Sequence, residues 1–284
     1  MECELKRIKI YYEIYGEGHP ILMIHGFMPD HRLMKGCMEP IFKDRPNYKR
    51  IYFDLPGMGK TQGKQWIKNS DQIFELVLEF IDKIIPNQSF IIASESYGCY
   101  LARGLIYKRM KFIDGVLFLC PLIIPQPSKR SLPEPITLKE DRKLLSKLSS
   151  QDREEFKGTA VVQNQRIWER FKEEVLNGIR IADDEFLNEI FEKGYAFSFD
   201  VDKLILRFDK PTLFLLGRQD ISVGYRDAWN TIEQYPRATF AILDEAGHIL
   251  EIEKEILFNC LVNEWLDRVE YYISSEIQQN KDRK

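Results

Sequence analysis

The sequence predicts an α/β fold with a mostly parallel central sheet and helices on both of its faces. Short apolar runs recur along the chain, amphipathic stretches of helical length separate them, and the alternation stops in one long stretch. Strands of a parallel sheet read as continuous apolar runs because helices bury both of their faces. The expected strands are residues 9–15, 21–24, 50–53, 89–93, 115–120, 212–216 and 238–243.

Two amphipathic helices are expected to cover the sheet. The first spans about 71–85, with Asp71 in its first turn and Pro86 directly after its end. An acidic residue suits the positive end of a helix, and proline cannot continue one. The second spans about 251–272 and repeats the helical spacing of apolar residues. The polar residues after it predict a frayed C-terminal tail.

The strand pattern is interrupted between the expected strands at 115–120 and 212–216. Four prolines within 125–135 indicate a linker. Helical stretches follow at 138–148, 161–176 and 184–193, and Gly194 is expected to end the last one. The predicted organisation is an α/β core of residues 1–124 and 211–273, an all-helical insertion of residues 125–210, and a polar tail of residues 274–284.

Composition excludes several classes of protein. The 284-residue chain is 44% hydrophobic, enough for one large core, and its net charge of −3 gives no electrostatic reason to bind nucleic acid or an anionic membrane. No stretch reaches the roughly 20 apolar residues of a membrane span. The charged first residues lack the apolar core of a signal peptide. Five cysteines, without metal-ligand spacing, favour a reducing cytoplasm.

The most informative segment places Ser96 between an apolar strand and a helix-like stretch. A serine hydroxyl is a strong nucleophile only when the backbone exposes it and a base removes its proton. Asp220 follows a later apolar run, and His248 lies further along the chain. Ser96 is therefore expected to attack a carbonyl, His248 to carry the proton, and Asp220 to orient the ring. Asp244 is the less favoured acid, because it lies on the strand before the histidine turn.

Four motifs in this order resemble those of the α/β-hydrolase superfamily, and the resemblance covers nearly the whole chain. It implies that the insertion is the helical cap of that fold. It also implies an oxyanion hole made by the backbone N–H groups of Phe27 and Tyr97. The motifs are Met-Ile-His-Gly-Phe at 23–27, Asp-Leu-Pro-Gly-Met-Gly-Lys at 54–60, Ser-Glu-Ser-Tyr-Gly at 94–98 and Gly-Arg-Gln-Asp at 217–220.

One position departs from the pattern of the superfamily. Its first elbow glycine is Ser94 here, a small residue that suits the close approach of strand and helix, and also a rival nucleophile without the central place in the turn. Serine rather than aspartate at position 96 argues, by resemblance, against haloalkane dehalogenases and epoxide hydrolases. His25 is expected to be a structural hydrogen-bonding residue and Glu251 a partner at a loop or helix start. The histidines show no metal-binding spacing, so no metal and no cofactor are expected.

A pocket is expected between the elbow and the cap, at the carboxyl ends of the strands. Apolar lining favours an uncharged ester, so the predicted function is a carboxylesterase that cleaves small to medium apolar esters through an acyl-enzyme on Ser96. The cap also carries aromatic residues at 171, 195, 197 and 199, most of them expected in its own core. The expected lining residues are Met28, Leu122, Trp168, Val223 and Ile249.

Three alternatives to this function stay open. Proline iminopeptidase-like cleavage would use cap carboxylates such as Glu169, Glu173 and Glu174 to hold a free amine, although on a helix these are more simply surface residues. Carbon–carbon bond hydrolysis would use the same three residues. A small-molecule receptor that signals to a partner would use them little. The natural substrate and the oligomeric state do not follow from the sequence.

Overall fold

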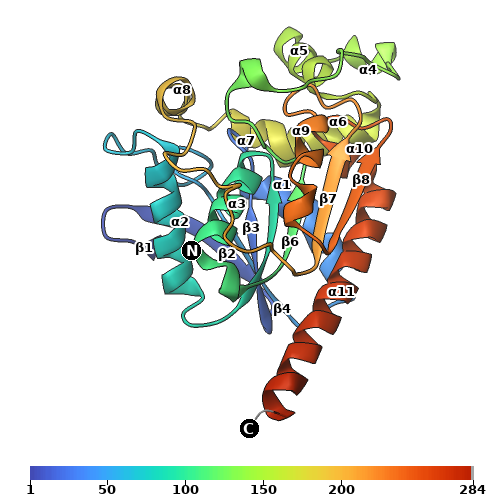
Figure 1. Ribbon diagram of the computed structural model, residues 1–284. Helices are drawn as coiled ribbons and strands as arrows, with labels where there is room; N and C mark the ends of the chain where they lie inside the picture. Colours follow the sequence, from blue (N-terminus) through green and yellow to red (C-terminus); the bar gives the residue numbers. More distant parts are fainter. Residues whose placement is uncertain (283–284) are drawn as a thin grey trace.

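An eight-stranded sheet forms the centre of the computed structural model, which describes residues 1–282 (Figure 1). The strand order is β1-β2-β4-β3-β5-β6-β7-β8. The strands from β4 to β8 along this order pair in parallel, whereas β1 and β2 are antiparallel at one edge. The strands are β1 (Glu2–Glu4), β2 (Lys9–Tyr15), β3 (His19–Ile24), β4 (Tyr48–Phe53), β5 (Phe90–Glu95), β6 (Ile113–Leu119), β7 (Thr212–Gly217) and β8 (Ala238–Leu243).

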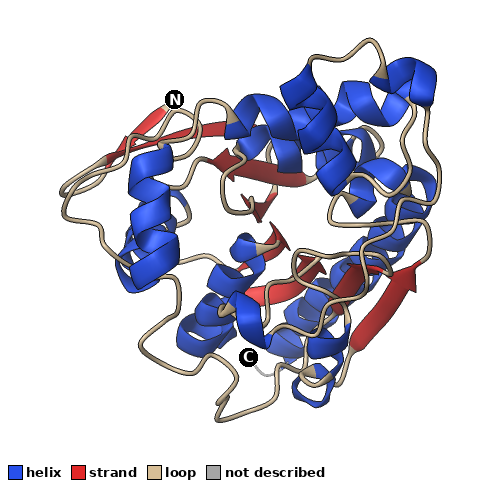
Figure 2. Cartoon of the chain, turned by 90° about the horizontal axis from the view of Figure 1, so that it is seen from above, coloured by secondary structure: helices blue, strands red, loops and turns tan. Residues whose placement is uncertain are grey.

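Helices pack on both faces of this sheet, as the view from above shows (Figure 2). One pair is α1 (His31–Phe42) with α11 (Glu255–Asp282), and the other is α2 (Ser70–Ile84) with α3 (Tyr97–Arg109). Two of these helices are capped by the side chain of the preceding residue. Asp30 accepts the Arg32 N–H at the start of α1, and Asn69 accepts the Gln72 N–H at the start of α2. The protein has the α/β-hydrolase fold.

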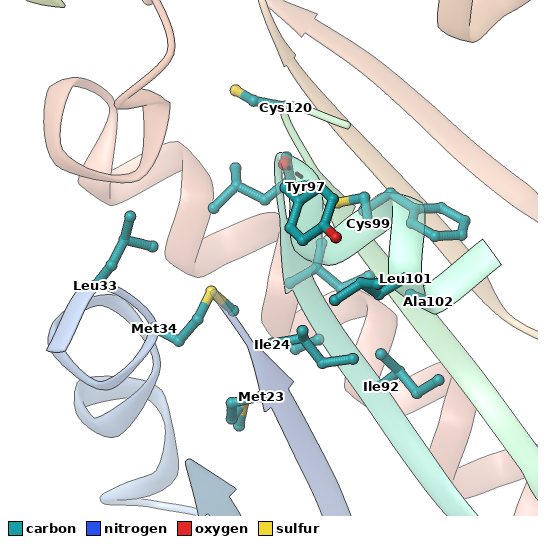
Figure 3. Close-up of a cluster of buried hydrophobic side chains, with 14 of the residues drawn as sticks. Met23, Ile24, Leu33, Met34, Ile92, Tyr97, Cys99, Leu101, Ala102 and Cys120 are labelled. Atoms are coloured by element: carbon teal, nitrogen blue, oxygen red, sulfur yellow. Dashed lines mark hydrogen bonds between the residues drawn. The ribbon is translucent and has the colours of Figure 1, made fainter. Parts of the chain in front are cut away.

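The core between the sheet and its helices is apolar and close-packed. Ile24 of β3, Met34 of α1 and Leu101 of α3 are fully buried and lie near one another (Figure 3). Trp265 of α11 is also fully buried, and its indole N–H donates to the Pro211 carbonyl at 3.1 Å. Buried indole N–H groups need such a partner, which ties α11 to the start of β7.

The segment between β6 and β7 is helical and lies above the carboxyl ends of the strands (Figure 1). That edge of the sheet is where α/β folds build their sites. No helix within residues 1–282 has both the length and the apolar character needed to cross a bilayer. The elements of the segment are η2 (Pro127–Lys129), α4 (Arg142–Leu145), α5 (Ser150–Thr159), α6 (Gln165–Phe171), the π-helical turn η3 (Lys172–Leu176), α7 (Asn177–Ile179) and α8 (Asp184–Lys193).

Each expected strand is present, with bounds that move by at most two residues. The sequence did not indicate β1, α1, α5 or the short helix α9 (Arg226–Trp229). The helix expected at 138–148 shrinks to α4, because Leu138 and Lys139 donate to the Val161 carbonyl and Lys139 forms a β-bridge with Val162. Tertiary pairing therefore overrides local helix propensity there.

The C-terminal region also differs from expectation. The last helix is divided at Lys254 into α10 (Leu250–Glu253) and α11, and α11 continues to Asp282, beyond the expected end at residue 272. Its residues include neither glycine nor proline, so nothing in the local sequence ends it. Ser274 and Ser275 donate to carbonyls one turn earlier, a bond compatible with continued helix. Residues 283–284 of the predicted tail lie outside the described residues.

Candidate active site

Ser96 occupies a strained turn between β5 and α3. Its φ of 50° and ψ of −113° lie in a region that residues with a side chain rarely adopt. The Ser96 N–H donates to the Leu119 carbonyl at 3.0 Å, and the Ser96 carbonyl accepts the Leu122 N–H at 3.1 Å. Backbone strain of this kind costs on the order of 1–3 kcal/mol and persists only where neighbours hold it. The turn projects the hydroxyl away from the sheet at the strand end.

Small residues stand two positions before and after Ser96, and at Gly26 in the neighbouring loop, because the chain passes very close to them. A Cβ atom on Gly98 would lie 2.3 Å from the Ile24 carbonyl oxygen, and one on Gly26 would lie 3.2 Å from the Ser96 Cβ. Ser94 fits at the position of the missing glycine because its hydroxyl donates to the Leu117 carbonyl at 2.9 Å. Ser94 is fully buried in the strand.

His248 joins Ser96 to Asp220 through hydrogen bonds. The His248 Nε2 atom lies 3.0 Å from the Ser96 Oγ atom, and Nδ1 lies 2.8 Å from Asp220 Oδ2. The other Asp220 oxygen, Oδ1, accepts the N–H groups of Ser222 at 2.8 Å and Val223 at 3.1 Å. A carboxylate in this position accepts a hydrogen bond from Nδ1–H, and this fixes the tautomer in which the lone pair of Nε2 faces the serine hydroxyl.

Gln219 connects the loop of Asp220 to the loop of His248. Its backbone N–H donates to the Ala246 carbonyl at 3.0 Å, and its side-chain oxygen accepts the Ala246 N–H at 3.2 Å. Its amide nitrogen donates to Asp244 at 2.8 Å. Asp244, the less favoured acid, is therefore exposed and bonded to Gln219 rather than to the imidazole.

Glu253 connects the histidine loop to the insertion, which the sequence analysis did not foresee. Its Oε1 atom accepts the N–H groups of Val161 at 2.7 Å and Val162 at 3.0 Å. Its Oε2 atom accepts the Gly247 N–H at 2.6 Å. These partners are distant in sequence, so no local pattern could have indicated the contact.

Two further buried carboxylates lie near the imidazole. Glu95 is 2% exposed, and its Oε1 atom lies 3.2 Å from His248 Nε2, while Oε2 has no hydrogen-bond partner among the described residues. Glu251 is 1% exposed, and neither of its oxygens has a partner there. Glu251 lies in the first turn of α10, at a helix start as expected, although its carboxylate accepts no hydrogen bond there among the described residues. The visible signal for Glu95 was a charged residue in an apolar strand directly before Ser96.

The carboxylates around His248 shift its protonation. Burial lowers the pKa of the imidazole, but the charge of Asp220, its hydrogen bond to the ring, and the charges of Glu95 and Glu251 together raise that pKa to about 9. Burial raises the pKa of Glu95 to about 7, against the attraction of His248. Burial, with the charge of Glu95, also raises the pKa of Glu251 to about 8. Perturbed groups gathered at a strand end are typical of a functional site.

Two backbone N–H groups beside Ser96 are available to a ligand. Among the described residues, neither Phe27 nor Tyr97 donates its N–H within the protein, and their rings contact edge-to-face at 5.3 Å. His25 holds the loop before Phe27: its Nε2 accepts the Leu55 N–H at 3.0 Å, so Nδ1 donates to the Gly26 carbonyl at 2.7 Å. Burial lowers the pKa of His25, which keeps the ring neutral.

Of the expected lining residues, some lie next to Ser96, Asp220 and His248, and Trp168 lies elsewhere. Leu122, Val223 and Ile249 are buried next to the turns that carry Ser96, Asp220 and His248 respectively. Met28 has a φ of 85° in the loop after Phe27. Trp168 instead packs in the insertion, with its ring centroid 5.3 Å from Phe156 and 6.2 Å from Phe171.

Two aromatic residues of the insertion, Tyr195 and Phe191, contact Phe27, and Tyr195 also reaches Tyr97. The Tyr195 ring stacks on Tyr97 with 5.1 Å between centroids and contacts Phe27 edge-to-face at the same distance. Phe197 stacks on Tyr100 at 4.4 Å, further along α3. Under this cover Ser96 keeps 8% of its surface exposed.

Asp54, in the second of the sequence motifs, forms a separate buried cluster with Asp30 and His31. Asp54 accepts the backbone N–H groups of His31 at 2.9 Å and Lys60 at 2.8 Å, and also contacts His31 Nδ1 at 2.7 Å. Arg32 binds both oxygens of Asp30. Protein donors already engage these carboxylates, as expected for a structural turn.

Comparison with known proteins places the chain among hydrolases. The model of the family described as "Serine aminopeptidase, S33" matches residues 20–255. A solved α/β superfamily hydrolase from Oenococcus oeni PSU-1 is 26% identical, with a TM-score of 0.85 over 95% of this chain and 99% of that one. A thermophilic esterase from Thermogutta terrifontis is 17% identical, with a TM-score of 0.60 over 92% of this chain and 94% of that one, and so shares the fold.

A curated relative matches this chain over a shorter segment. The protein named "Putative carbamate hydrolase RutD", from Pseudomonas savastanoi pv. phaseolicola, is 27% identical over 100 residues, which are 32% of this chain. The chain spans only 39% of the length of that relative.

Proposed function

This chain belongs to the serine aminopeptidase S33 family of α/β-hydrolases, and we propose that it is a carboxylesterase that acts through an acyl-enzyme on Ser96. The observation that carries the proposal is the continuous set of hydrogen bonds from Ser96 through His248 to Asp220, at 3.0 and 2.8 Å. The strained turn at Ser96 supports it, because strain of this kind occurs where a fold holds a reactive group in place.

The proposed first half-reaction is acylation. Ser96 Oγ attacks the ester carbonyl while Nε2 of His248 takes the hydroxyl proton, and Asp220 stabilises the resulting imidazolium. The negative charge that develops on the carbonyl oxygen is met by the N–H groups of Phe27 and Tyr97, which have no competing acceptor among the described residues. The imidazolium then protonates the departing alcohol. A water molecule, deprotonated by the same nitrogen, releases the acid and restores Ser96.

The lining supports uncharged esters of small to medium size. Leu122, Val223 and Ile249 are buried apolar residues next to the three site residues. We propose that they, together with Met28, surround the substrate, and that Trp168 acts through the packing of the cap. A solved esterase with the same fold is consistent with this class of substrate.

Amide hydrolysis of a substrate with a free amine is the second candidate, because the family is described as a serine aminopeptidase. The cap carboxylates first considered for this role are poorly suited: Arg170 binds Glu174 at 2.6 Å, and Gln165 donates to Glu169 at 2.7 Å. Glu251 suits it better, since both of its buried oxygens lack a partner among the described residues.

A panel of p-nitrophenyl esters of increasing acyl length, run beside a panel of aminoacyl p-nitroanilides, distinguishes these activities. The proposal predicts the higher kcat/KM on a short or medium ester. Faster cleavage of the anilides would replace it with the second candidate. Negligible turnover of both panels, with a ligand that raises the melting temperature, would favour a receptor instead.

A further inference from the structure

We propose that Glu95 is a second carboxylate partner of His248, and that it shares Nε2 with Ser96 and sets the basicity of that nitrogen. Asp220 orients the opposite side of the ring, so Glu95 is additional to the three residues of the proposed mechanism. The catalytic consequence rests on the proposed function. The contact between the two side chains does not, and it can be tested separately.

The geometry places two oxygens at one nitrogen atom. Ser96 Oγ lies 3.0 Å from His248 Nε2, and Glu95 Oε1 lies 3.2 Å from the same atom. Asp220 accepts the hydrogen bond from Nδ1, so only Nε2 can change partner. It accepts a hydrogen bond when it is unprotonated and donates one when it carries a proton. A neutral ring accepts the Ser96 hydroxyl there, whereas an imidazolium donates its Nε2–H to Glu95 in a charge-assisted hydrogen bond.

Glu95 lacks the partners of an ordinary structural carboxylate. Glu253 is nearly as buried, yet three backbone N–H groups satisfy it. The Oε2 atom of Glu95 instead has no hydrogen-bond partner within residues 1–282, and it is enclosed so tightly that a Cβ on Gly26 would lie 2.1 Å from it. A buried carboxylate with so few donors stays ionised only where a positive charge compensates it, and otherwise takes up a proton. His248 is the group that can supply that charge.

The groups around Glu95 support this pairing. Burial raises the pKa of Glu95, the positive charge of His248 lowers it, and the negative charge of Asp220 raises it again, while the Gly26 N–H stabilises the ionised form slightly. In the opposite direction, the charge of Glu95 raises the pKa of His248. Other titratable groups on the surrounding elements are Glu251 of α10, Tyr195 of the insertion, Cys99 of α3 and Cys120 after β6, none of which can be positive.

The arrangement has a defined effect on proton transfer. When Nε2 takes the Ser96 proton, the new imidazolium lies between two carboxylates, Asp220 and Glu95. The proton later leaves with the alcohol. Glu95 is therefore unchanged at the end of the reaction. An ionised Glu95 repels the lone pair of the neutral ring and attracts the imidazolium. It therefore favours the transition state over the ground state. The cost is that at low pH the proton stays between Nε2 and Glu95, and Ser96 is not activated.

The test compares Glu95→Gln with the wild-type enzyme over a range of pH. Removal of the charge should move the acid limb of the kcat/KM profile on a p-nitrophenyl ester to lower pH by about one unit or more, a tenfold change in proton affinity. It should also lower the alkaline plateau of kcat. Glu95→Asp keeps the charge and should retain a limb close to that of the wild type.

Glu251→Gln is the matched control, since Glu251 is equally buried and lies three residues after His248 but has no contact with Nε2. The acid limb of the kcat/KM profile of Glu251→Gln should move less than that of Glu95→Gln. Equal movement in both variants would overturn the proposal, because a general loss of buried charge would then explain it. No movement in Glu95→Gln would also overturn it.

NMR titration of the His248 ring provides a readout without catalysis. The ring resonances are assigned by comparison with His248→Gln, and the imidazole pKa should fall in Glu95→Gln. An unchanged pKa rejects the proposal whatever the activity. A lowered pKa in a protein that hydrolyses no ester supports the contact while the proposed function fails. If Glu95→Gln is unfolded by circular dichroism, Glu95→Met provides the uncharged variant of similar length, with the same expected fall in pKa.

Discussion

The carboxylate of Glu253 accepts the Gly247 N–H at 2.6 Å and so fixes the backbone one residue before His248. Its other oxygen binds the backbone of Val161 and Val162 in the insertion. One side chain thus joins the roof of the site to the loop that carries the imidazole. The position of His248 therefore depends on the docking of the insertion.

Glu253→Gln is expected to loosen this connection. The amide can keep one acceptor for the insertion but offers N–H₂ where the Gly247 N–H needs an acceptor. A buried donor without a partner costs about 1–3 kcal/mol, so the free energy of unfolding should fall by that order. kcat/KM should fall as well, because His248 is less well held. Urea unfolding and ester hydrolysis measure the two effects. Glu192→Gln, on the exposed surface of α8, is the control, and a loss of similar size there would contradict the assignment.

Ser96→Ala should abolish labelling by a fluorophosphonate probe, while Ser94→Ala should retain it. The reason is that Ser96 Oγ faces Nε2 of His248, whereas the Ser94 hydroxyl donates to the Leu117 carbonyl inside the sheet. Gel fluorescence and mass spectrometry of the labelled peptide report the site. Labelling that survives Ser96→Ala would identify another nucleophile.

Asp220→Asn should lower kcat by several orders of magnitude, with roughly 10⁴-fold as the precedent for a mis-set histidine tautomer. Asp244→Asn should have a small effect, because Asp244 is exposed and bonded to Gln219. Steady-state kinetics on one ester and thermal unfolding of both variants separate catalysis from folding. A large kinetic loss in Asp244→Asn with a normal Asp220→Asn would reverse the two assignments.

Glu13 of β2 should make the protein more sensitive to acid. It accepts the hydroxyls of Tyr11 and Tyr15 and the Lys35 ammonium, each at 2.7 Å, and lies 3.3 Å from His31 Nε2. Burial works against its ionisation, but Lys35, the tyrosines and His31 outweigh burial and hold the pKa of Glu13 at about 2, below its usual 4.5.

The sign of the effect follows from this depressed pKa. The folded state binds fewer protons than the unfolded state, so Glu13 stabilises the fold fully above pH 4.5 and loses that contribution as the pH falls toward about 2. The stability difference between wild type and Glu13→Gln should therefore shrink across this interval. Urea unfolding at several pH values measures it. A difference that stays constant would contradict the role of the charge, and Glu185→Gln, exposed on α8, is the control.

The positions of seven strands along the chain, and the turns that follow them, could be predicted because these are local features. An apolar run, a small residue and a serine at position 96 are neighbours in sequence, and the backbone geometry of the turn follows from them. The helix α2 was predictable in the same way, from Asp71 in its first turn and Pro86 after its end. The helix expected at 138–148 is reduced to α4, and its first two residues instead donate to the Val161 carbonyl.

The sequence by itself determined the α/β-hydrolase fold and the serine, aspartate and histidine that meet at the carboxyl edge of the sheet, because adjacent parallel strands bring their ends together. Only the tertiary structure decided which other groups reach the imidazole. Glu95 contacts Nε2, Glu251 remains without a partner among the described residues, and Glu253 joins Gly247 to the insertion. Their burial and partners depend on how the insertion packs over the sheet, and segments distant in the chain create that environment. The identity of a carboxylate is a property of the sequence, but its pKa and its partner are properties of the folded protein.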